Sequence, residues 1–395
     1  MIKRLGVLLF ALALVAAACG DDSGDTDTTT ATTAGGGTDT TATTTGGGGG
    51  GDGDGDGDGG GDAGQGGGTL AAVQARGVLN CGVSTGAVAF TELQPDGSAT
   101  GIDADYCRAV AAAVLGDANA VVFFPTTAAE RFDVLKAGQV DVLFRNTTWT
   151  ASRDKQVGLD FGPTTYFDGQ GLMGPSNRFT ATSGPSDVDG AILCTNAGTT
   201  TEKNIREWAA LGGASIQLET VENFSEAMDA FIAGRCDLVT TDASGLVGEK
   251  VSRELSGEIE VDSWVVFPPS PISKEPLGPA YRQNDSEWAD VVDWTVYSTF
   301  IAFEKGMNST NVDDMRALAG TDDGDPEIAR MFGDANPEIV AAFGLPGDAF
   351  YQVISQVGSY DEIFDANLNP VGLFRQGGLN DLWTEGGLIY APPFR

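Results

Sequence analysis

The chain has 395 residues, with 56 Asp and Glu against 22 Lys and Arg and no histidine, so its formal net charge is −34. The absence of imidazole excludes Ser/His/Asp and Cys/His nucleophilic machinery, HExxH zinc sites and His-ligated haem, and we expect neither a metal nor a cofactor. The excess of acid makes a nucleic acid a poor partner, because binding its phosphates requires Lys and Arg. A small molecule is therefore the expected ligand.

The first residues are typical of an export signal. Lys3 and Arg4 are basic, residues 5–15 are apolar, and residues 16–18 are three alanines that suit a cleavage site. The apolar run is too short for a permanent membrane helix, which needs about 20 residues. Cys19 follows directly, and the sequence Ala-Ala-Ala-Cys resembles the bacterial lipobox, whose cysteine is diacylated. The alternative is a chance cysteine behind a plain secretory signal.

Residues 20–68 contain only Gly, Asp, Thr, Ala, Ser and one Gln. Such a segment cannot bury enough apolar surface to offset its ordering entropy, so we expect it to be disordered. We therefore assign residues 1–18 to a lipoprotein signal peptide and residues 19–68 to the lipidated cysteine and a flexible tether. Two acyl chains on Cys19 would hold the protein on a lipid bilayer, on the outer, extracytoplasmic face of the cytoplasmic membrane.

Four further cysteines support an exported protein. They are Cys81, Cys107, Cys194 and Cys236, and an even number in an exported chain suggests two disulfides with three alternative connectivities. Cys81 lies in an apolar run and Cys107 in a helical run early in the chain, whereas Cys194 and Cys236 each fall in a later short strand. We predict the pairs Cys81–Cys107 and Cys194–Cys236. Four buried thiols are the alternative, and the lack of CxxC spacing argues against a metal site.

From residue 69 the pattern alternates between strand and helix, with lengths typical of βαβ units. We expect strands at residues 78–83, 121–124, 140–144, 191–195, 216–220 and 236–241, and helices at residues 103–115, 128–137, 200–210 and 225–233. Residues 135–143 and 231–239 also have similar sequences. Two similar α/β lobes are predicted, with a ligand cleft beyond the carboxyl ends of their strands. Helices at 288–303 and 337–343 should pack on the first lobe.

Several segments carry a family resemblance. They are CGVSTG (81–86), GIDADYCR (101–108), RNTTWTASR (145–153), YFDGQG (166–171), ISKEPLG (272–278), GLNDLW (378–383) and GGLIYAPP (386–393). These segments resemble the polar amino-acid solute-binding proteins of ABC importers (family 3), and among them most nearly the general L-amino-acid-binding proteins. The resemblance covers essentially residues 69–395.

The resemblance implies an α/β fold of the hinged, two-lobed, periplasmic-binding-protein-like kind (type II), with a helical C-terminal extension. Lobe 1 is expected at residues 69–168 and lobe 2 at residues 169–270, while residues 271–395 return to lobe 1 and form the extension. The chain should cross between the lobes at residues 166–171 and 268–276, where Gly and Pro punctuate strands. We expect a monomer.

In lobe 1 the resemblance implies a site for an α-carboxylate. Arg153 matches the family's carboxylate-binding arginine, together with Thr148 and a backbone contact at Asn146, and Arg suits this task because its guanidinium binds a carboxylate in a bidentate way. The alternative for Arg153 is a surface arginine at a helix start. Arg131 occupies a position from which some relatives, especially those for glutamate and aspartate, reach the ligand side chain. It could instead pair with an acid on its own helix, Glu130 or Asp133.

In lobe 2 the resemblance implies an anion site at a helix start. Thr199 and Glu202 fit a capping box, which leaves the N–H groups near Thr200 and Thr201 aimed at an anion. A capped helix with no ligand is the alternative, and the family resemblance favours the contact. Asp242 matches the family's ammonium-binding acid, although it could instead cap the turn that follows it.

The expected function follows from these residues and from the family. We expect an extracytoplasmic lipoprotein that captures free L-amino acids in the interlobe cleft and delivers them to the permease subunits of an ABC importer. Because residues 86–89 lack the aromatic ring that several single-substrate relatives place against the ligand, the pocket should be roomy and its specificity broad. The alternatives are a sensory or adhesive amino-acid-binding lipoprotein and a dehydratase on the same fold. Since no acid other than Asp242 is available as a tuned catalytic group, we expect no enzyme.

Overall fold

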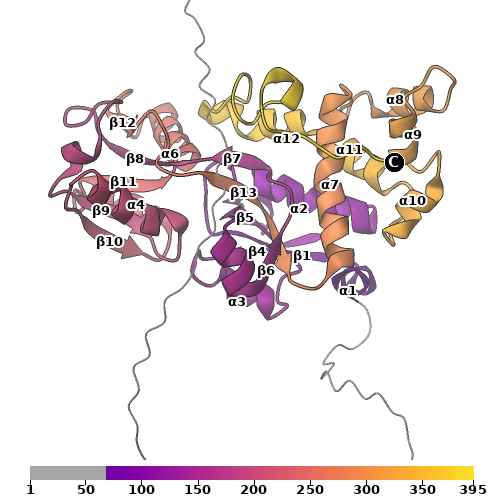
Figure 1. Cartoon of the computed structure of the whole chain (residues 1–395), viewed down its shortest axis with the longest axis horizontal. Helices are drawn as coiled ribbons and strands as arrows, with labels where there is room; N and C mark the ends of the chain where they lie inside the picture. Colours follow the sequence, from indigo (N-terminus) through magenta and orange to yellow (C-terminus); the bar gives the residue numbers. More distant parts are fainter. Residues whose placement is uncertain (1–67) are drawn as a thin grey trace, which may run out of the picture. The chain divides into compact units, whose positions relative to one another are not determined.

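The computed structural model describes residues 68–395 (Figure 1). The expected signal peptide, the lipidated Cys19 and the tether up to residue 67 lie outside the described residues. Among the described residues, none of the helices combines the length and the apolarity that a membrane span requires.

The first sheet has the strand order β4-β1-β5-β13-β6, and β7 also pairs with β13. Its strands are β1 (Leu79–Ser84), β4 (Val121–Thr126), β5 (Val142–Thr148), β6 (Leu159–Phe161), β7 (Tyr166–Asp168) and β13 (Glu275–Arg282). β4, β1 and β5 run parallel, whereas β13 is antiparallel to its neighbours. The helices α2 (Ile102–Leu115) and α3 (Arg131–Lys136) contact this sheet, and α1 (Thr69–Arg76) packs beside α2.

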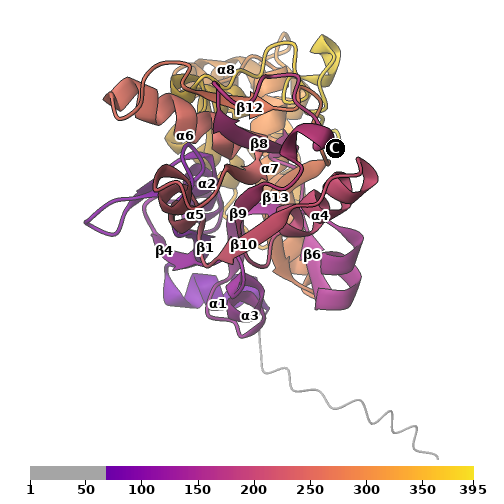
Figure 2. The same cartoon turned by 90° about the vertical axis from the view of Figure 1, so that its left-hand side faces the viewer.

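The second sheet has the order β10-β9-β11-β8-β12. Its strands are β8 (Gln170–Pro175), β9 (Ile192–Asn196), β10 (Gln217–Val221), β11 (Leu238–Asp242) and β12 (Trp264–Phe267), with β10, β9 and β11 parallel. Its helices are α4 (Thr200–Leu211), α5 (Phe224–Ile232) and α6 (Ala243–Ser256), which contact the strands of this sheet (Figure 2). The strand and helix alternation expected from the sequence is thus present twice.

The chain crosses between the two sheets twice, in the segments where Gly and Pro punctuate the sequence. The first crossing joins β7 to β8 through Gly169, and the second joins β12 to β13. A Cβ on Gly169 would lie 2.3 Å from Cβ of Pro271 and 2.8 Å from the carbonyl oxygen of Ser273. Only glycine therefore lets the two crossings run side by side.

Two local expectations were wrong. The helix expected at residues 128–137 is confined to α3. Before it, the N–H of Thr127 donates to the Glu130 carboxylate and the N–H of Glu130 donates to the Thr127 hydroxyl, which closes a separate turn. Cys236 precedes β11 rather than lying within it. The reason is that Asp237 binds the N–H of Ile192 through its carboxylate, so that the regular ladder with β9 begins at Leu238.

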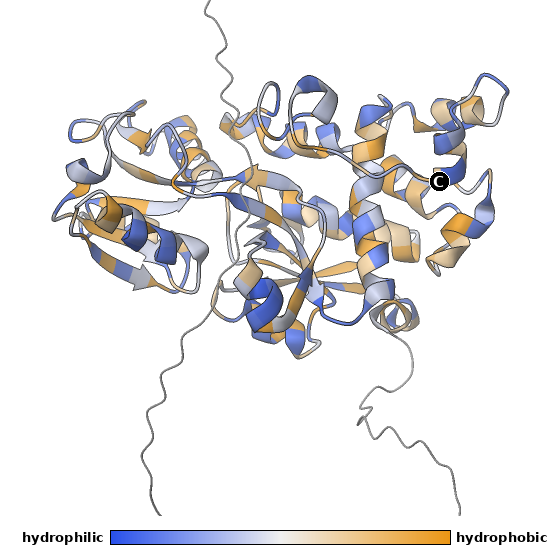
Figure 3. Ribbon diagram, in the orientation of Figure 1, coloured by the Kyte–Doolittle hydropathy of each residue, from blue (hydrophilic) through white to orange (hydrophobic). Residues whose placement is uncertain are grey.

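The C-terminal helices share a hydrophobic core with the first sheet. They are α7 (Ser286–Glu304), α8 (Val312–Ala319), α9 (Pro326–Met331), α10 (Pro337–Ala342), α11 (Ala349–Gln356) and α12 (Tyr360–Asn367). Figure 3 shows apolar residues alternating with polar ones along α7, and its buried face packs on α2, α11 and α12. Trp288 is fully buried in this core and donates its indole N–H to the carbonyl of Asp141 at 3.0 Å.

The segment after α12 reaches the hinge. Asn380 accepts a hydrogen bond from the N–H of Phe167 at 2.7 Å and donates one to its carbonyl at 3.1 Å, so its amide pairs with both backbone groups of the middle residue of β7. The short turn η3 (Asn369–Val371) in the same segment contacts α6 of the second sheet. The C-terminal extension therefore contacts the first sheet directly and the second group of elements through α6.

Both disulfides have the pairing predicted from the sequence. Cys81 is joined to Cys107 and Cys194 to Cys236, so that one bridge lies within each group of elements.

Replacing the second pair by alanines (C194A/C236A) should lower the free energy of unfolding by about 4 kcal/mol, and the first pair (C81A/C107A) by about 3.5 kcal/mol, in the chain-entropy model. The larger effect belongs to the larger loop, since the sequence separations are 42 and 26 residues. Urea denaturation of each double variant against the unmodified protein measures these losses. An unchanged midpoint after complete reduction of the unmodified protein would show that the bridges do not stabilise the fold.

Candidate functional site

Polar residues gather where parallel strands of the two sheets end. Thr85 follows β1, Asn146 lies near the end of β5, and Asn196 and Asp242 are the last residues of β9 and β11. Together they line a cavity, which adjoins a second, narrower one. Five residues line both cavities: Arg145, Asn146, Asn196, Thr241 and Asp242. The position beyond the carboxyl ends of strands is the one the sequence predicts.

Arg153 is a buried residue and not a surface arginine. It begins the short π-helix η1 (Arg153–Gly158), is 7% exposed, and donates from Nη1 to the carbonyl of Thr148 at 2.7 Å. Burial lowers the pKa of its guanidinium to about 10, while Glu275 and Asp242 act in the opposite direction. Arg153 is therefore cationic at neutral pH and lines the narrower cavity.

Arg131 also faces this cavity. It is 2% exposed and pairs with neither Glu130 nor Asp133, since Glu130 accepts the N–H of Thr127 and Asp133 pairs with Lys136. Its Nε has no hydrogen-bond partner within the described residues. Burial, together with the neighbouring cations Arg145 and Arg153, lowers the pKa of Arg131 well below its ordinary value.

Arg145 is a site residue that the sequence analysis did not assign. It is 5% exposed, donates from Nε to the carbonyl of Thr126 at 3.1 Å and from Nη1 to the side chain of Asn146 at 3.3 Å. Burial lowers its pKa to about 10, and Asp103 opposes this shift. The available signal was its position directly after the buried run 140–144, at the end of the strand where ligands are expected.

Asn146 holds an unusual backbone conformation, with φ of +33°. The buried carboxylate of Asp103, at the start of α2, accepts the N–H of Asn146 at 2.8 Å and fixes this turn. Burial raises the pKa of Asp103 to about 7, against the hydrogen bond from Asn146 and the charge of Arg145. The Asn146 side chain in turn accepts a hydrogen bond from Arg145, and it counteracts the rise in the pKa of Asp242, so it lies between groups from the two sheets.

The start of α4 forms the opposite wall of the narrower cavity. Thr199 caps the helix by accepting the N–H of Glu202 at 3.0 Å, and Glu202 accepts the N–H of Gly198 at 3.0 Å. The hydroxyls of Thr200 and Thr201 donate to Glu275 and Thr199. Within the described residues the backbone N–H groups of Thr200 and Thr201 have no acceptor, so they remain available to an anion. The hydroxyls of Thr148 and Thr200 lie 3.4 Å apart, so the two walls are in contact.

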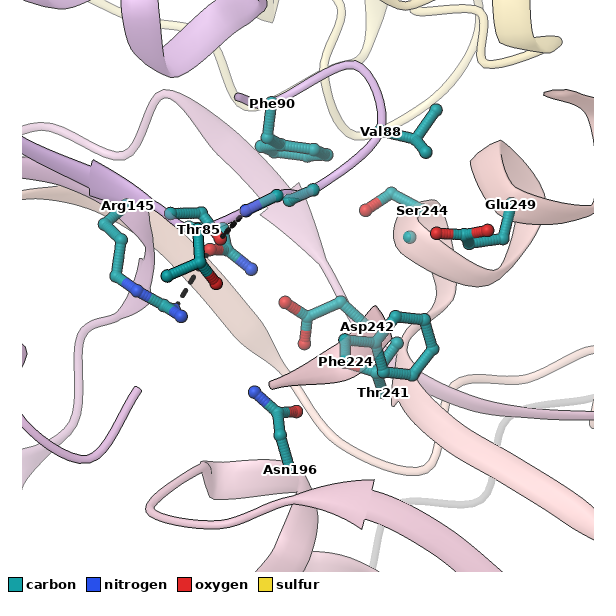
Figure 4. Close-up of a pocket in the computed structure, with 15 residues that line it drawn as sticks. Thr85, Val88, Phe90, Arg145, Asn196, Phe224, Thr241, Asp242, Ser244 and Glu249 are labelled. Carbon is teal, nitrogen blue, oxygen red and sulfur yellow. Dashed lines mark hydrogen bonds between the residues drawn. The ribbon is translucent and has the colours of Figure 1, made fainter. Parts of the chain in front are cut away.

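Asp242 is the acid of the site. It is 8% exposed. Its side chain does not cap α6, because at that helix start the carboxylate of Asp168 accepts the hydrogen bonds from the N–H and the hydroxyl of Ser244. Burial first, and then the nearby acids Asp168 and Glu275, raise the pKa of Asp242 well above its ordinary value. In Figure 4 its carboxylate points into the cavity, toward the side lined by Thr85 and Arg145.

The wider cavity does have aromatic walls. Residues 86–89 carry no ring, as the sequence shows, but Phe90 and Phe224 line the cavity (Figure 4). The loop 86–89 thus lacks a ring as expected, and the aromatic side chains of this cavity come from the residue just after it and from the start of α5. Residues 87 and 91 form a bridge that turns the loop back on itself, and Phe90 packs edge-on against Tyr166 with ring centroids 5.3 Å apart. The polar lining of this part includes Thr85, Ser244 and Glu249.

The two sheets, joined by two crossings and enclosing a polar cavity at their strand ends, define a hinged binding protein for a small solute. The chain belongs to the bacterial extracellular solute-binding proteins, family 3, because the model of that family matches residues 79–299. The fold and the family expected from the sequence are thus confirmed.

Relatives match over most of the chain. The general L-amino acid-binding periplasmic protein AapJ of Rhizobium johnstonii is 41% identical over 331 residues, covering 83% of this chain and 93% of that protein. The glutamate/glutamine/aspartate/asparagine-binding protein BztA of Rhodobacter capsulatus is 40% identical, with the same coverage. A solved ABC-transporter periplasmic binding protein from Brucella ovis, with glutathione bound, is 41% identical with a TM-score of 0.76, covering 83% of this chain and all of that one. The protein is thus an extracytoplasmic solute-binding protein of amino-acid ABC transport and not an enzyme.

The raised pKa of Asp242 predicts a pH-dependent cost to the ligand-free fold. A carboxyl whose pKa is higher in the folded than in the unfolded state destabilises the fold increasingly as pH rises above about 4, by about 1.4 kcal/mol for each unit of difference. Asp242→Asn should therefore gain stability relative to the unmodified protein between pH 5 and pH 8, measured by urea denaturation at both pH values. Asp323→Asn, at an exposed acid, controls for the change in net charge. A D242N advantage that does not grow with pH would contradict the assignment.

Proposed function

We propose that this protein is a lipid-anchored receptor that captures free L-amino acids in the cavity between its two sheets and delivers them to an ABC permease. The observation that carries the proposal is the meeting of Arg153 and Asp242, mounted on different sheets, at one polar cavity. A free amino acid carries a carboxylate and an ammonium on one carbon, and these two groups match the two charges.

Each end of the zwitterion has a set of partners. The guanidinium of Arg153 and the free N–H groups of Thr200 and Thr201 suit the α-carboxylate, with Thr148 beside them. The carboxylate of Asp242 suits the ammonium, and Asn146 lines both cavities beside it. Because these partners come from both sheets, a bound zwitterion stabilises the closed arrangement by its greater affinity for it.

The narrow cavity favours amino acids with a second carboxylate. Three buried guanidiniums, those of Arg131, Arg145 and Arg153, line it, and none of them forms an ion pair with a protein carboxylate in the described residues. One α-carboxylate leaves Arg131 and Arg145 without an anion. We infer that glutamate and aspartate bind tightly, in keeping with the name of the Rhodobacter capsulatus relative.

The wider cavity leaves room for larger ligands. It extends past Asp242 to Phe90, Phe224 and Glu249, away from Arg131 and Arg153, and shares Arg145 with the narrower cavity. This space suits long side chains or a γ-glutamyl peptide, and the Brucella ovis relative has glutathione bound. Glutathione therefore belongs in the set of ligands to be tested.

The anchor and the permease complete the proposal. The lipobox-like Ala-Ala-Ala-Cys sequence ending at Cys19 supports diacylation, and the Gly/Thr/Asp tether gives the binding domain reach from the bilayer. A sensory or adhesive lipoprotein would capture the same ligands without import. Uptake of labelled amino acid is compared between cells that lack the protein and the same cells supplied with it again. Only a transport receptor restores the uptake.

A calorimetric screen of the purified protein against the twenty amino acids and glutathione tests the capture of ligand. We expect heat of binding with several amino acids, glutamate and aspartate among the tightest. Arg153→Ala should weaken every ligand by about 2–5 kcal/mol, at least about 30-fold, because it leaves a buried carboxylate without its cation. Asp242→Asn should act likewise through the ammonium.

Arg235→Ala is the matched control, since Arg235 is an exposed arginine outside both cavities. It should bind as the unmodified protein does. Retention of full affinity by folded R153A would refute the carboxylate assignment, and heat with a single amino acid alone would refute broad specificity.

Cys19→Ala tests the anchor. Without the thiol no diacylation takes place, so the variant should move from the membrane fraction to the soluble fraction of a cell that processes bacterial lipoproteins, while its affinity for ligand stays unchanged. Fractionation followed by immunoblotting measures this. A C19A protein that remains with the membrane would show that the lipobox-like sequence is not the anchor.

A further inference from the structure

Glu275 is a buried acid at the hinge to which none of the functions above assigns a role. It is the first residue of β13, directly after the second crossing, and is 1% exposed. Its Oε2 accepts the hydroxyl of Thr200 at 2.8 Å, and its Oε1 accepts the side-chain amide of Asn204 at 2.9 Å and the hydroxyl of Ser273. Two of its three donors thus belong to α4, the helix whose start faces the ligand.

Burying a carboxylate is costly, so its hydrogen bonds must compensate for lost hydration. The apolar side of α4, including Ile205 and Ala209, packs on its own sheet without help from Glu275. What Glu275 adds is the placement of the first turn, because it binds Thr200 in that turn and Asn204 one turn later. Both bonds tie the helix to the hinge strand rather than to its own sheet.

The bond to Thr200 also determines which atoms of α4 meet the ligand. The Thr200 hydroxyl proton is committed to Glu275, so this residue offers the cavity its backbone N–H. Arg153 lies on the other side of the same cavity. The charge of Glu275 raises the pKa of Arg153 and so counteracts the lowering by burial. Glu275 therefore acts on both groups that face a ligand carboxylate without lining the cavity itself.

We propose that Glu275 is a positioning residue for ligand binding, which fixes the first turn of α4 opposite Arg153 so that the N–H groups of Thr200 and Thr201 and the guanidinium converge on one carboxylate. The proposal rests on the proposed capture of amino acids. It assigns a binding role to the EP dipeptide that opens the hinge strand (275–276).

The charged groups that face Glu275 determine its effect on pH dependence. They are Arg153 on η1, Asp242 on β11, and Asp168 on β7, which is the residue directly opposite Glu275 in the β7–β13 pair. Glu275 raises the pKa of Asp242 and of Asp168. Removing its charge should therefore make Asp242 easier to ionise, and the loss of affinity on acidification should move to lower pH.

Calorimetry of Glu275→Gln with glutamate between pH 5 and pH 8 tests the proposal. We expect at least about a 10-fold loss of affinity at pH 7, a shift of the acid limb to lower pH, and an unchanged or higher melting midpoint without ligand. A role confined to fold stability would lower the midpoint and leave the pH profile in place. Ser273→Ala is the matched control: it removes a donor to the same carboxylate outside α4 and should bind within twofold of the unmodified protein.

Asn204→Ala gives a second measure, because Asn204 binds Glu275 and lies outside both cavities. It should weaken binding about threefold or more, and it decides the question if E275Q does not fold. A folded E275Q with unchanged affinity and pH profile, or unchanged affinity in N204A when E275Q does not fold, overturns the proposal. An unmodified protein that binds no amino acid would instead refute the proposed function.

Discussion

The site depends on the burial of unlike charges that do not neutralise one another inside the protein. Arg131, Arg145 and Arg153 lie on α3, β5 and η1, on the side of the first sheet, and Asp242 ends β11 of the second sheet, all nearly removed from solvent. Burial is costly for every one of them, as the shifted pKa values show. The proposed zwitterionic ligand would compensate for both signs of charge at once. Ligand binding and closure are therefore expected to be one thermodynamic event, because each requires the other.

The hinge strands carry two acids that act on this cavity without lining it. Asp168 and Glu275 lie opposite each other on β7 and β13, and each holds the start of a helix of the second sheet, α6 and α4. Those two helices follow the strands that end at Asp242 and Asn196. The hinge strands thus hold in place the helix starts beside the ligand, and the glycine at position 169 allows the two crossings to lie close enough for this.

Much of the fold could be predicted from the sequence, because apolar periodicity, Gly and Pro report on local structure. The positions of most strands and helices, both disulfides and the two crossings follow from such signals. Arg153 was singled out by the family resemblance, and Asp242 by its place at a strand end together with that resemblance. Their presence at one cavity is observed, whereas their ligand contacts remain a proposal.

Other site residues could not be predicted for a physical reason. Arg145 sits in a run that reads as an ordinary buried strand, and its exposure to the cavity depends on the strand's end. Phe90 enters the cavity because its loop folds back through a bridge between residues 87 and 91. Glu275 meets α4 across 75 residues of sequence. Contacts of this kind arise from the arrangement of elements in space, which local periodicity does not report.

The amide of Asn380 has a consequence for how the protein meets other chains. β7 lies on the outer side of β13, and Phe167 stands opposite Pro276, so both backbone groups of Phe167 point outward. An outer strand with unpaired backbone groups is a template for association with another polypeptide. The Asn380 side chain binds these backbone groups of Phe167, so the sheet ends there. The C-terminal segment thus covers the backbone of a short hinge strand that would otherwise be free to pair with another chain.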